Sequence, residues 1–428
     1  MERLVISGGK KLGGFYTLPA AKNALLPIAA AALMTDGECR IKNCPDLSDV
    51  SATVDIIKSV DSCAVMQEGT LTICYRDSNK NEIDEKLCGR MRSSILYLAP
   101  LLYRKGSVKM YCPGGCTIGE RPVDIHLDGL EKMGAQIQCE GGAITVQALN
   151  GLKGAQIKLR LPSVGATQTL IMAAATAKGL TVLKNCAREP EIVDLARFLN
   201  SAGAKITGAG RHEVIIQGVP CLTGVEYTPI PDRIVAATVL AAVNSCKGWC
   251  VIKNYPHQYM AQFENMLTKT GLKLVRYSDN ILVYKYAHRP SPTMVHTGYY
   301  PAFSTDMGPL LAAAMANNTE TVEICETVFE NRFSYGEDFK KLGICCTTKG
   351  GCFRQNMCAD ATDCHLCAKD LRAGAALVVA ALSKKGHFTL DGVNYIDRGY
   401  ENIETIFKNL GADIRRIQLD QTEEDKTE

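Results

Sequence analysis

The sequence has 428 residues, of which 46% are hydrophobic and 22% are charged, and its formal net charge is +3. This composition is ordinary for a globular protein, and the length predicts two domains with substantial cores. The small net charge gives no reason to expect a nucleic-acid partner, although it leaves room for a locally basic surface that binds anions. The start lacks a basic and then apolar leader, and no apolar run approaches the roughly 20 residues of a membrane span, so we expect a cytoplasmic protein.

Six segments along the chain are rich in Ala and Leu and are apolar on nearly every helical face. Such helices are typical of the interior of a domain, because none of their faces suits contact with water. Each segment is followed by a short turn, a strand, an amphipathic helix and a hairpin of alternating apolar residues. The six segments are 20–34, 92–103, 166–177, 232–243, 305–316 and 371–382.

A short phrase that contains glycine recurs where each amphipathic helix should end. The clearest copies, EKMGAQI, NSAGAKI, TKTGLKL and KNLGADI, are centred on Gly134, Gly203, Gly271 and Gly411, and KKLGICC at Gly343 is a weaker one. A degraded copy has Asp61 in place of the glycine. Successive copies lie about 70 residues apart, a spacing typical of repeated supersecondary units. We expect the glycine to end the helix in the left-handed conformation.

Six such units predict an α/β fold made of two similar inside-out α/β domains, each with three βαβ-type repeats and buried helices, around an interdomain cleft. We expect the first domain to span 22–229 and the second to combine 1–21 with 230–428. The segment 227–232 contains two prolines and suits a crossing between them. The N-terminal strand at 3–9 has no helix before it and should complete the sheet of the second domain.

The starts of the six buried helices should gather at one end of each domain. Their backbone N–H groups and helix dipoles favour anions there. Lys and Arg residues recur at these starts and in the later loops of the units, as at Lys22, Arg92, Arg372 and Arg398. Two such ends that face each other predict a pocket for strongly anionic ligands.

The segment 111–126, YCPGGCTIGERPVDIH, stands apart from the repeat. Its Pro and Gly residues exclude a helix or a central strand, so we expect a long loop. Long connections of this kind are usually functional when they are not disordered, and apolar runs flank this one. It carries the thiol of Cys116 beside Arg121 and Asp124, and we interpret it as a mobile lid with a reactive cysteine.

The pattern P-G-G-C-T-I-G-x-R-P-x-D-x-H at 113–126 closely resembles the catalytic loop of the UDP-N-acetylglucosamine enolpyruvyl transferase (1-carboxyvinyltransferase) family. The resemblance extends over essentially the whole chain, since the family has two inside-out α/β domains around a cleft. It implies transfer of the enolpyruvyl group of phosphoenolpyruvate to the 3-hydroxyl of UDP-N-acetylglucosamine with release of phosphate, the first committed step of peptidoglycan synthesis. The expected partners are these two substrates, with no cofactor, metal, nucleic acid, membrane or obligate protein partner.

The resemblance also implies roles for individual residues. Cys116 would protonate the methylene carbon of phosphoenolpyruvate, form a covalent adduct with it, and be alkylated by fosfomycin. A thiol with a pKa of about 8.5 retains its proton at neutral pH, whereas an unperturbed carboxylic acid does not. Lys22, Arg121 and Arg398 would contact phosphate or carboxylate groups, and Asp306 would accept or orient the proton of the 3-hydroxyl. Substrate contacts besides Lys22 and Asp306 would come from Asn23, Arg92, Arg121, Pro122, Val123, Asp124, Ile125, Leu161, Pro162, Ser163, Val164, Val328, Phe329, Arg332 and Arg372.

Several of these residues also have a purely structural interpretation. Asp306 and Ser163 each precede a predicted helix and could serve as N-caps, and Lys22 could be a solvated side chain. His126 suits a structural role beside the loop. For the charged residues near 188–191, Arg188, Glu189 and Glu191, we prefer helix capping to substrate binding. Two functional alternatives remain, a shikimate-phosphate enolpyruvyl transferase and a non-catalytic paralogue that binds UDP-sugars.

The chain contains 19 cysteines. Without a predicted signal peptide we expect reduced thiols and no disulfides. Cys364 and Cys367 form a C-x-x-C pair, but the second pair that a zinc knuckle requires is missing, so we do not predict zinc.

Overall fold

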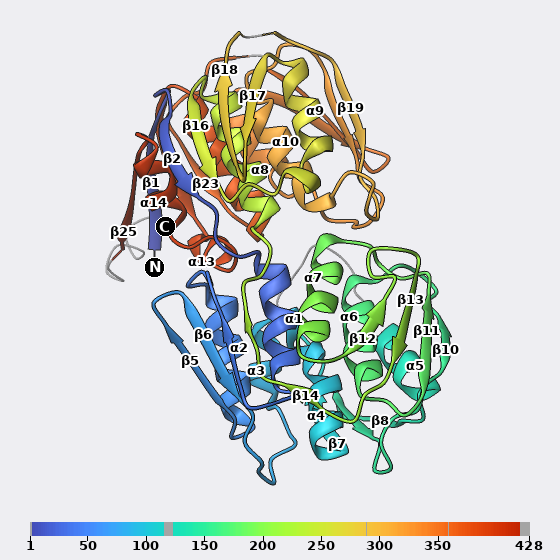
Figure 1. The fold of residues 1–428 in the computed structure, drawn as a ribbon. Coiled ribbons are helices and arrows are strands. Elements are labelled where there is room, and N and C mark those ends of the chain that lie inside the picture. The colour runs from blue at the N-terminus through green and yellow to red at the C-terminus, as the bar shows by residue number, and fades with distance from the viewer. Residues whose placement is uncertain (1, 115–122, 288, 358, 420–428) are drawn as a thin grey trace.

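The computed structural model describes residues 2–114, 123–287, 289–357 and 359–419. Their buried apolar side chains form two separate clusters, one drawn from residues 21–222 and the other from residues 4–18 and 234–414. We call the parts of the chain around these clusters the first lobe and the second lobe; they are the lower and the upper body in Figure 1. Both are α/β, and both have helices inside and sheets outside, which confirms the predicted inside-out architecture.

The apolar segments of the sequence form the interior of each lobe. In the second lobe α12 packs against both α8 and α10, and every residue of α8 is buried. In the first lobe α6 packs against α4 and is buried from Ala166 to Ala175. The first-lobe helices are α1 (Lys22–Ala32), α4 (Leu98–Lys105) after the 3₁₀ turn η1 (Arg92–Tyr97), and α6 (Val164–Ala175). The second-lobe helices are α8 (Arg233–Ser245), α10 (Gly308–Ala314) after the 3₁₀ turn η3 (Thr305–Met307), and α12 (Leu371–Ser383).

Small sheets cover these helices, and five of those in the described ranges have one topology. The first strand pairs parallel to the second, the second antiparallel to the third, and the third antiparallel to the fourth. Alternating burial along the strands turns one side chain in two toward the helices. In sheet order, the first of these sheets contains β15 (Glu226–Tyr227), β4 (Glu38–Ile41), β6 (Thr70–Cys74) and β5 (Cys63–Gln67), and the second contains β10 (Gln156–Lys158), β11 (Leu180–Lys184), β13 (Glu213–Gln217) and β12 (Lys205–Thr207). The third contains β2 (Gly13–Thr17), β16 (Trp249–Lys253), β18 (Asn280–Lys285) and β17 (Leu272–Tyr277), and the fourth contains β19 (Thr293–His296), β20 (Val322–Cys325), β22 (Cys352–Met357) and β21 (Ile344–Lys349). The fifth contains β23 (Cys364–Cys367), β24 (Gly386–Asp391), β1 (Glu2–Gly8) and β25 (Asp413–Gln418).

The remaining unit has three strands, β7 (Ser107–Tyr111), β9 (Ala143–Gln147) and β8 (Gln136–Glu140), and a parallel bridge between Glu82 and Lys109 takes the place of the first strand. The N-terminal strand β1 lies between β24 and β25, where Ile6 pairs with both Phe388 and Ile414. This is the position in the second lobe that was expected for it.

Each amphipathic helix ends at the repeated glycine phrase. The φ angles there are 95° at Gly134, 104° at Gly203, 95° at Gly271 and 87° at Gly411, all in the left-handed region. Asp61 in the degraded copy also has a left-handed φ, of 59°. The prediction is therefore confirmed for these glycines, and the copy that lost its glycine adopts the same conformation. The helices are α2 (Ser48–Ser59), α5 (Asp124–Lys132), α7 (Pro190–Ser201), α9 (Ala261–Lys269), α11 (Gly336–Lys341) and α14 (Ile403–Asn409).

The chain passes between the lobes in two adjacent crossings. The backbone N–H of Ala21 donates to the Ile230 carbonyl at 2.8 Å, and that of Asp232 donates to the Pro19 carbonyl at 3.0 Å. The crossings thus form a short hydrogen-bonded ribbon, which leads directly into the starts of α1 and α8 (Figure 1).

The cysteines of the second lobe depart from expectation at Cys325 and Cys352, and Cys345 of β21 is disulfide-bonded as well. A disulfide joins Cys325 of β20 to Cys352 of β22, so the prediction that all cysteines are reduced thiols is wrong for this pair. The two residues are opposite each other in the antiparallel ladder, with Cα atoms 4.0 Å apart. The sequence could not reveal this, because 27 positions separate the cysteines and only the register brings them together.

Cys364 and Cys367 do not belong to a metal-like cluster in the part of the chain that the structure describes. The group found there, Glu323 with Cys325 and Cys352, includes the disulfide itself.

Within the described residues, no helix combines the length and the apolar character needed to cross a membrane.

Candidate active site

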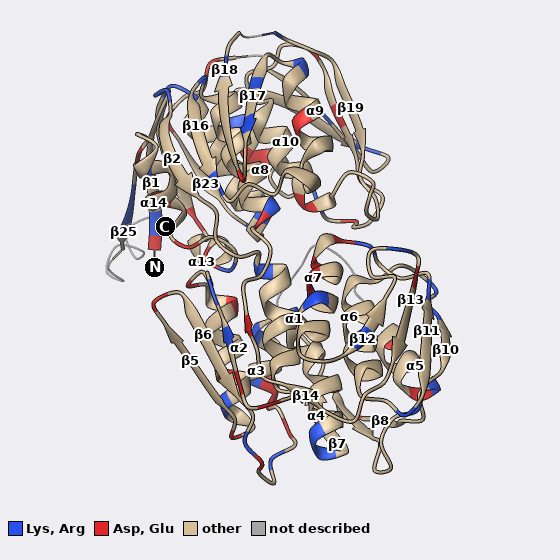
Figure 2. Ribbon diagram, in the orientation of Figure 1, with Lys and Arg blue, Asp and Glu red and all other residues tan. Residues whose placement is uncertain are grey.

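The starts of α1 and α8 lie where the two lobes approach each other, and Figure 2 shows basic segments at these facing ends. The N-cap of α8 is Asp232, whose carboxylate accepts from the backbone N–H groups of Ile234 and Val235 at 2.8 and 3.0 Å. The other oxygen of the same carboxylate accepts from the backbone N–H of Lys22, at 3.1 Å. One side chain therefore fixes the first turns of two buried helices that belong to different lobes.

Lys22 belongs to a buried three-residue cluster that joins the lobes. Its Nζ lies 3.0 Å from Oδ2 of Asp49, and Nε of Arg398 donates to Oδ1 of the same carboxylate at 3.0 Å. The side chains of Lys22 and Asp49 are 10% and 5% exposed, so the structure excludes a solvated lysine. Burial alone would raise the pKa of Asp49, but the charges of Lys22 and Arg398 outweigh it and hold that pKa below its usual value.

A second three-residue cluster lies around Asp306 in η3. Oδ1 of Asp306 accepts from Arg332 at 2.5 Å, and Oδ2 is 3.1 Å from Arg372. The arginine side chains are 3% and 5% exposed, whereas Asp306 is 26% exposed. Burial disfavours the charge of Arg372, yet the Asp306 carboxylate raises the pKa of that guanidinium overall. Asp306 is thus the solvent-facing member of the cluster.

Asp306 is not the N-cap of its helix. The N-cap position of η3 is Ser304 and that of α10 is Met307, neither with a side-chain capping bond. By contrast, Ser163 is the N-cap of α6 and accepts from the backbone N–H of Ala166 at 3.3 Å. The capping interpretation therefore holds for Ser163.

The charged residues near the start of α7 do not cap it, which corrects the interpretation that we preferred from the sequence. Glu189 occupies the N-cap position but makes no capping bond. Glu191 forms a buried ion pair with Arg233, with Nε and Oε1 3.0 Å apart, and Arg188 donates to the carbonyl of Tyr300 at 3.2 Å. Both contacts join the first lobe to the second.

The first-lobe residues proposed to bind the nucleotide surround the starts of η1, α5 and α6. Arg92 donates to the Pro113 carbonyl at 3.4 Å, and exposed Asp124 is paired with Arg160 at 2.6 Å. Burial, and next the charge of Arg92, lower the pKa of His126 to about 3, so its ring is neutral. Its Nδ1 lies 2.9 Å from Oγ1 of Thr169, which fits the structural role. Half-buried side chains in the expected set also include Asn23, Val123, Leu161, Pro162 and Val164, and Ile125 is buried.

Val328 and Phe329 follow β20 in a turn that Glu326 holds. The carboxylate of Glu326 accepts from the backbone N–H groups of Val328 and Phe329 at 2.8 and 3.2 Å. Its other oxygen accepts from the hydroxyl of Thr305 at 2.7 Å, directly before Asp306. The turn expected to meet the nucleotide is therefore connected to the second cluster.

Three of the predicted residues, Cys116, Arg121 and Pro122, lie outside the described residues, so their roles stay predictions from the sequence. Sequence reasoning missed Asp49 and Glu326. Asp49 is 27 positions from Lys22 and 349 from Arg398, and no local pattern marks such pairing. Glu326 stands beside the predicted Val328, and an acidic residue two positions before a predicted binding turn was a signal that could have been used.

Comparisons with known proteins identify the fold and the family. The family model of EPSP synthase (3-phosphoshikimate 1-carboxyvinyltransferase) matches residues 6–407. Among solved structures, the enolpyruvyl transferase NikO from Streptomyces tendae has a TM-score of 0.85 at 25% identity, covering 97% of this chain and 98% of that one. EPSP synthase from Acinetobacter baumannii has a TM-score of 0.77 at 17% identity, covering 98% and 100%, which shows the shared fold. The fold is that of an enolpyruvyl transferase.

Curated relatives show which family of enolpyruvyl transferases the chain is similar to. UDP-N-acetylglucosamine 1-carboxyvinyltransferase 2 of Caldanaerobacter subterraneus subsp. tengcongensis is 39% identical over 97% of this chain and 100% of its own length. UDP-N-acetylglucosamine 1-carboxyvinyltransferase 1 of Staphylococcus aureus is 38% identical, with the same coverage. The chain belongs to the UDP-N-acetylglucosamine 1-carboxyvinyltransferase family of enolpyruvyl transferases.

Proposed function

We propose that this protein transfers the enolpyruvyl group of phosphoenolpyruvate to the 3-hydroxyl of UDP-N-acetylglucosamine and releases phosphate. The observation that carries the proposal is full-length similarity, at 38–39% identity, to relatives named for this reaction. The two charged clusters support it chemically, because both substrates are anions.

Among the described ion pairs, each cluster joins one carboxylate to two cations, Asp49 to Lys22 and Arg398, and Asp306 to Arg332 and Arg372. Lys22 and Arg372 lie in the first turns of α1 and α12, where backbone N–H groups also favour anions. Guanidinium groups bind carboxylate and phosphate through paired hydrogen bonds. We assign the Lys22 cluster, together with Arg121, to phosphoenolpyruvate.

Asp306 is suited to handle the hydroxyl proton. Two buried guanidinium groups contact its carboxylate, Arg332 at Oδ1 and Arg372 at Oδ2, and positive charges this close stabilise the ionised form. Because Asp306 is the solvent-facing member of its cluster, a sugar hydroxyl can reach it. In the proposed reaction Asp306 orients the 3-hydroxyl and accepts its proton as the oxygen attacks.

The remaining steps follow from the chemistry of phosphoenolpyruvate. The 3-oxygen adds to C2 while the Cys116 thiol protonates C3, which gives a tetrahedral intermediate. Loss of a proton from C3 and cleavage of the bond between C2 and the phosphate oxygen restore the double bond and release phosphate. In this assignment Lys22, Arg121 and Arg398 stabilise the negative charge that develops on the carboxylate and phosphate.

The proposal is tested by measuring phosphate release from phosphoenolpyruvate with each acceptor. UDP-N-acetylglucosamine should support turnover and shikimate 3-phosphate should not. Turnover with shikimate 3-phosphate alone would assign the protein to the alternative transferase. Binding of UDP-N-acetylglucosamine without turnover would make it a non-catalytic UDP-sugar-binding paralogue.

A further inference from the structure

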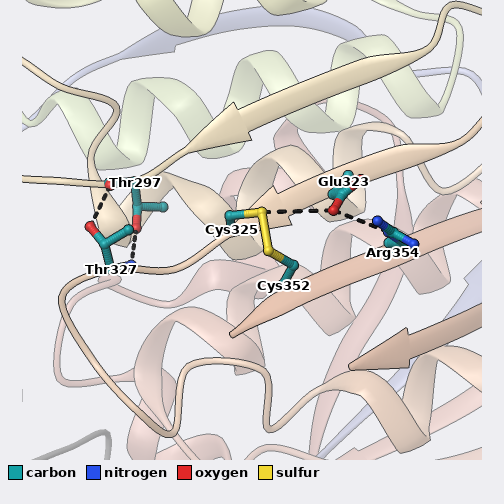
Figure 3. The surroundings of a disulfide bond; sticks show 6 residues. All are labelled: Thr297, Glu323, Cys325, Thr327, Cys352 and Arg354. Atoms are coloured by element: carbon teal, nitrogen blue, oxygen red, sulfur yellow. Dashed lines mark hydrogen bonds and ion pairs between the residues drawn. A yellow bond between two sulfur atoms is a disulfide. The ribbon is translucent and has the colours of Figure 1, made fainter. Parts of the chain in front are cut away.

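The disulfide lies at the base of the turn that holds Val328 and Phe329. Cys325 is the last residue of β20 and is 5% exposed, whereas Cys352, the first residue of β22, is half-buried. The bond lies beside an ion pair, since the Glu323 carboxylate lies 3.0 Å from Nε of Arg354 and 3.8 Å from Sγ of Cys325 (Figure 3). Cys352 is the more exposed residue of the pair.

Glu326 is bound to both sides of this bond. It follows Cys325 directly, and its backbone N–H donates to the carbonyl of Gly351, the neighbour of Cys352, at 2.9 Å. On the next residue, the Thr327 hydroxyl donates to the Thr297 carbonyl at 2.7 Å (Figure 3). The backbone position of Glu326 is thus set by the closed ends of the two strands.

The side chain of Glu326 connects these strand ends to the candidate active site. Its carboxylate holds the N–H groups of Val328 and Phe329 and the hydroxyl of Thr305. Thr305 also offers its carbonyl to Nε of Arg332, at 3.2 Å. A displacement of Glu326 would therefore move the turn proposed to meet the acceptor and disturb the support of the Asp306 cluster.

We propose that Cys325–Cys352 is a thiol-exchange site whose redox state sets the position of Glu326 and thereby the affinity for the nucleotide acceptor. The inference rests on the proposed function. Glu326 acts here as a positioning residue, because we assign it no contact with the 3-hydroxyl of the acceptor or with phosphoenolpyruvate.

The exchange requires a dithiol reductant. A thiolate of the dithiol attacks Sγ of Cys352, the sulfur–sulfur bond breaks, and Cys325 leaves as a thiolate that takes up a proton. The second thiol of the reductant then resolves the mixed disulfide. The protein gains two thiols, and the dithiol becomes a disulfide.

Reduction removes the covalent link between the strand ends, which then depend on non-covalent contacts such as the hydrogen-bonded ladder and the ion pair between Glu323 and Arg354. We expect the KM for UDP-N-acetylglucosamine to rise by about fivefold to tenfold, the equivalent of roughly one lost hydrogen bond. The KM for phosphoenolpyruvate should stay within about twofold, because in the described part of the chain the side-chain contacts of Glu326 lead to Thr305 and the turn, and not to Lys22 or Asp49.

The test compares protein isolated without reductant with the same protein after dithiothreitol treatment. Phosphate release gives both KM values, and alkylation followed by mass spectrometry gives the state of Cys325 and Cys352. If the untreated protein does not turn over, the proposed function fails. If it turns over with equal acceptor KM in both states, or if both cysteines are already free thiols, the redox inference is overturned.

Single-residue variants test whether the change in the acceptor KM depends on this disulfide and on Glu326. Cys352→Ser should show the raised acceptor KM with and without dithiothreitol, while Cys221→Ser, which removes an exposed thiol elsewhere, should respond like the wild type. Glu326→Gln keeps an acceptor for the two N–H groups and should retain the response, whereas Glu326→Ala should raise the KM in both states. A dithiothreitol response that persists in Cys352→Ser, with an unchanged thermal midpoint, would overturn the assignment.

Discussion

Asp49→Asn tests whether one buried carboxylate holds the lobes and the proposed phosphoenolpyruvate site together. The change keeps the size of the side chain and removes its charge. Lys22 and Arg398, whose side chains are 10% and 21% exposed, would then lie next to each other without the anion that balances them. Removal of one partner from a buried ion pair costs about 3–5 kcal/mol. Because Arg398 retains some contact with water, we expect the lower end, about 3 kcal/mol.

Asp55→Asn on the same helix is the matched control. Asp55 forms an ion pair with Arg90 in which both side chains are exposed, 44% and 42%. Exposed pairs contribute about 0–1 kcal/mol, so this variant should be nearly as stable as the wild type. The assay is urea unfolding followed by circular dichroism, with phosphate release measured on the same preparations. Equal losses of unfolding free energy in the two variants would refute the reasoning.

The pH dependence of the Asp49→Asn effect has a defined sign. The pKa of Asp49 is lower in the folded protein than in the unfolded chain, because the charges of Lys22 and Arg398 outweigh burial. Its contribution to stability is therefore complete above the unfolded pKa of about 3.9 and is lost as the pH falls through the folded value. The difference in stability between wild type and Asp49→Asn should stay constant from about pH 7 to pH 5 and shrink only in stronger acid.

Two further predictions concern the proton transfers. Cys116→Ser should remove most turnover at neutral pH, because a hydroxyl is a far weaker acid than a thiol. Cys116→Asp should stay active with a more acidic pH optimum and should resist fosfomycin. Wild-type turnover in Cys116→Ser would exclude the acid role. Asp306→Asn should lower turnover by on the order of 100-fold with a much smaller loss of nucleotide affinity. The Asp306→Asn change should also lower the thermal midpoint of unfolding, because Arg332 and Arg372 lose the anion that pairs with them. Unchanged turnover in this variant would mean that another group acts as the base.

The repeat made much of the fold predictable from sequence. A helix without a polar face must be buried, and a recurring glycine phrase marks where its partner helix ends in a left-handed turn. Asp61, in the copy without glycine, adopts the same conformation, which the sequence did not predict. The position of β1 followed because a strand without a helix before it needs a partner elsewhere.

The pairing of charges was not predictable to the same extent. The sequence marked Lys22, Arg398 and Asp306 as candidates, but not Asp49, whose partners come from both lobes. The preference for capping at Glu191 failed because its partner Arg233 lies at the start of a helix in the other lobe. The disulfide was hidden for the same reason, since strand register and not spacing brings Cys325 to Cys352.

The account is tested most directly by the chemical structure of the product. Phosphoenolpyruvate labelled with ¹³C at C2 is incubated with the protein and UDP-N-acetylglucosamine, and the purified nucleotide is examined by NMR. We predict a coupling across oxygen between the labelled carbon and the proton on C3 of the sugar, with one phosphate released for each product formed. A coupling to another sugar position, or recovery of both substrates unchanged, would contradict the account.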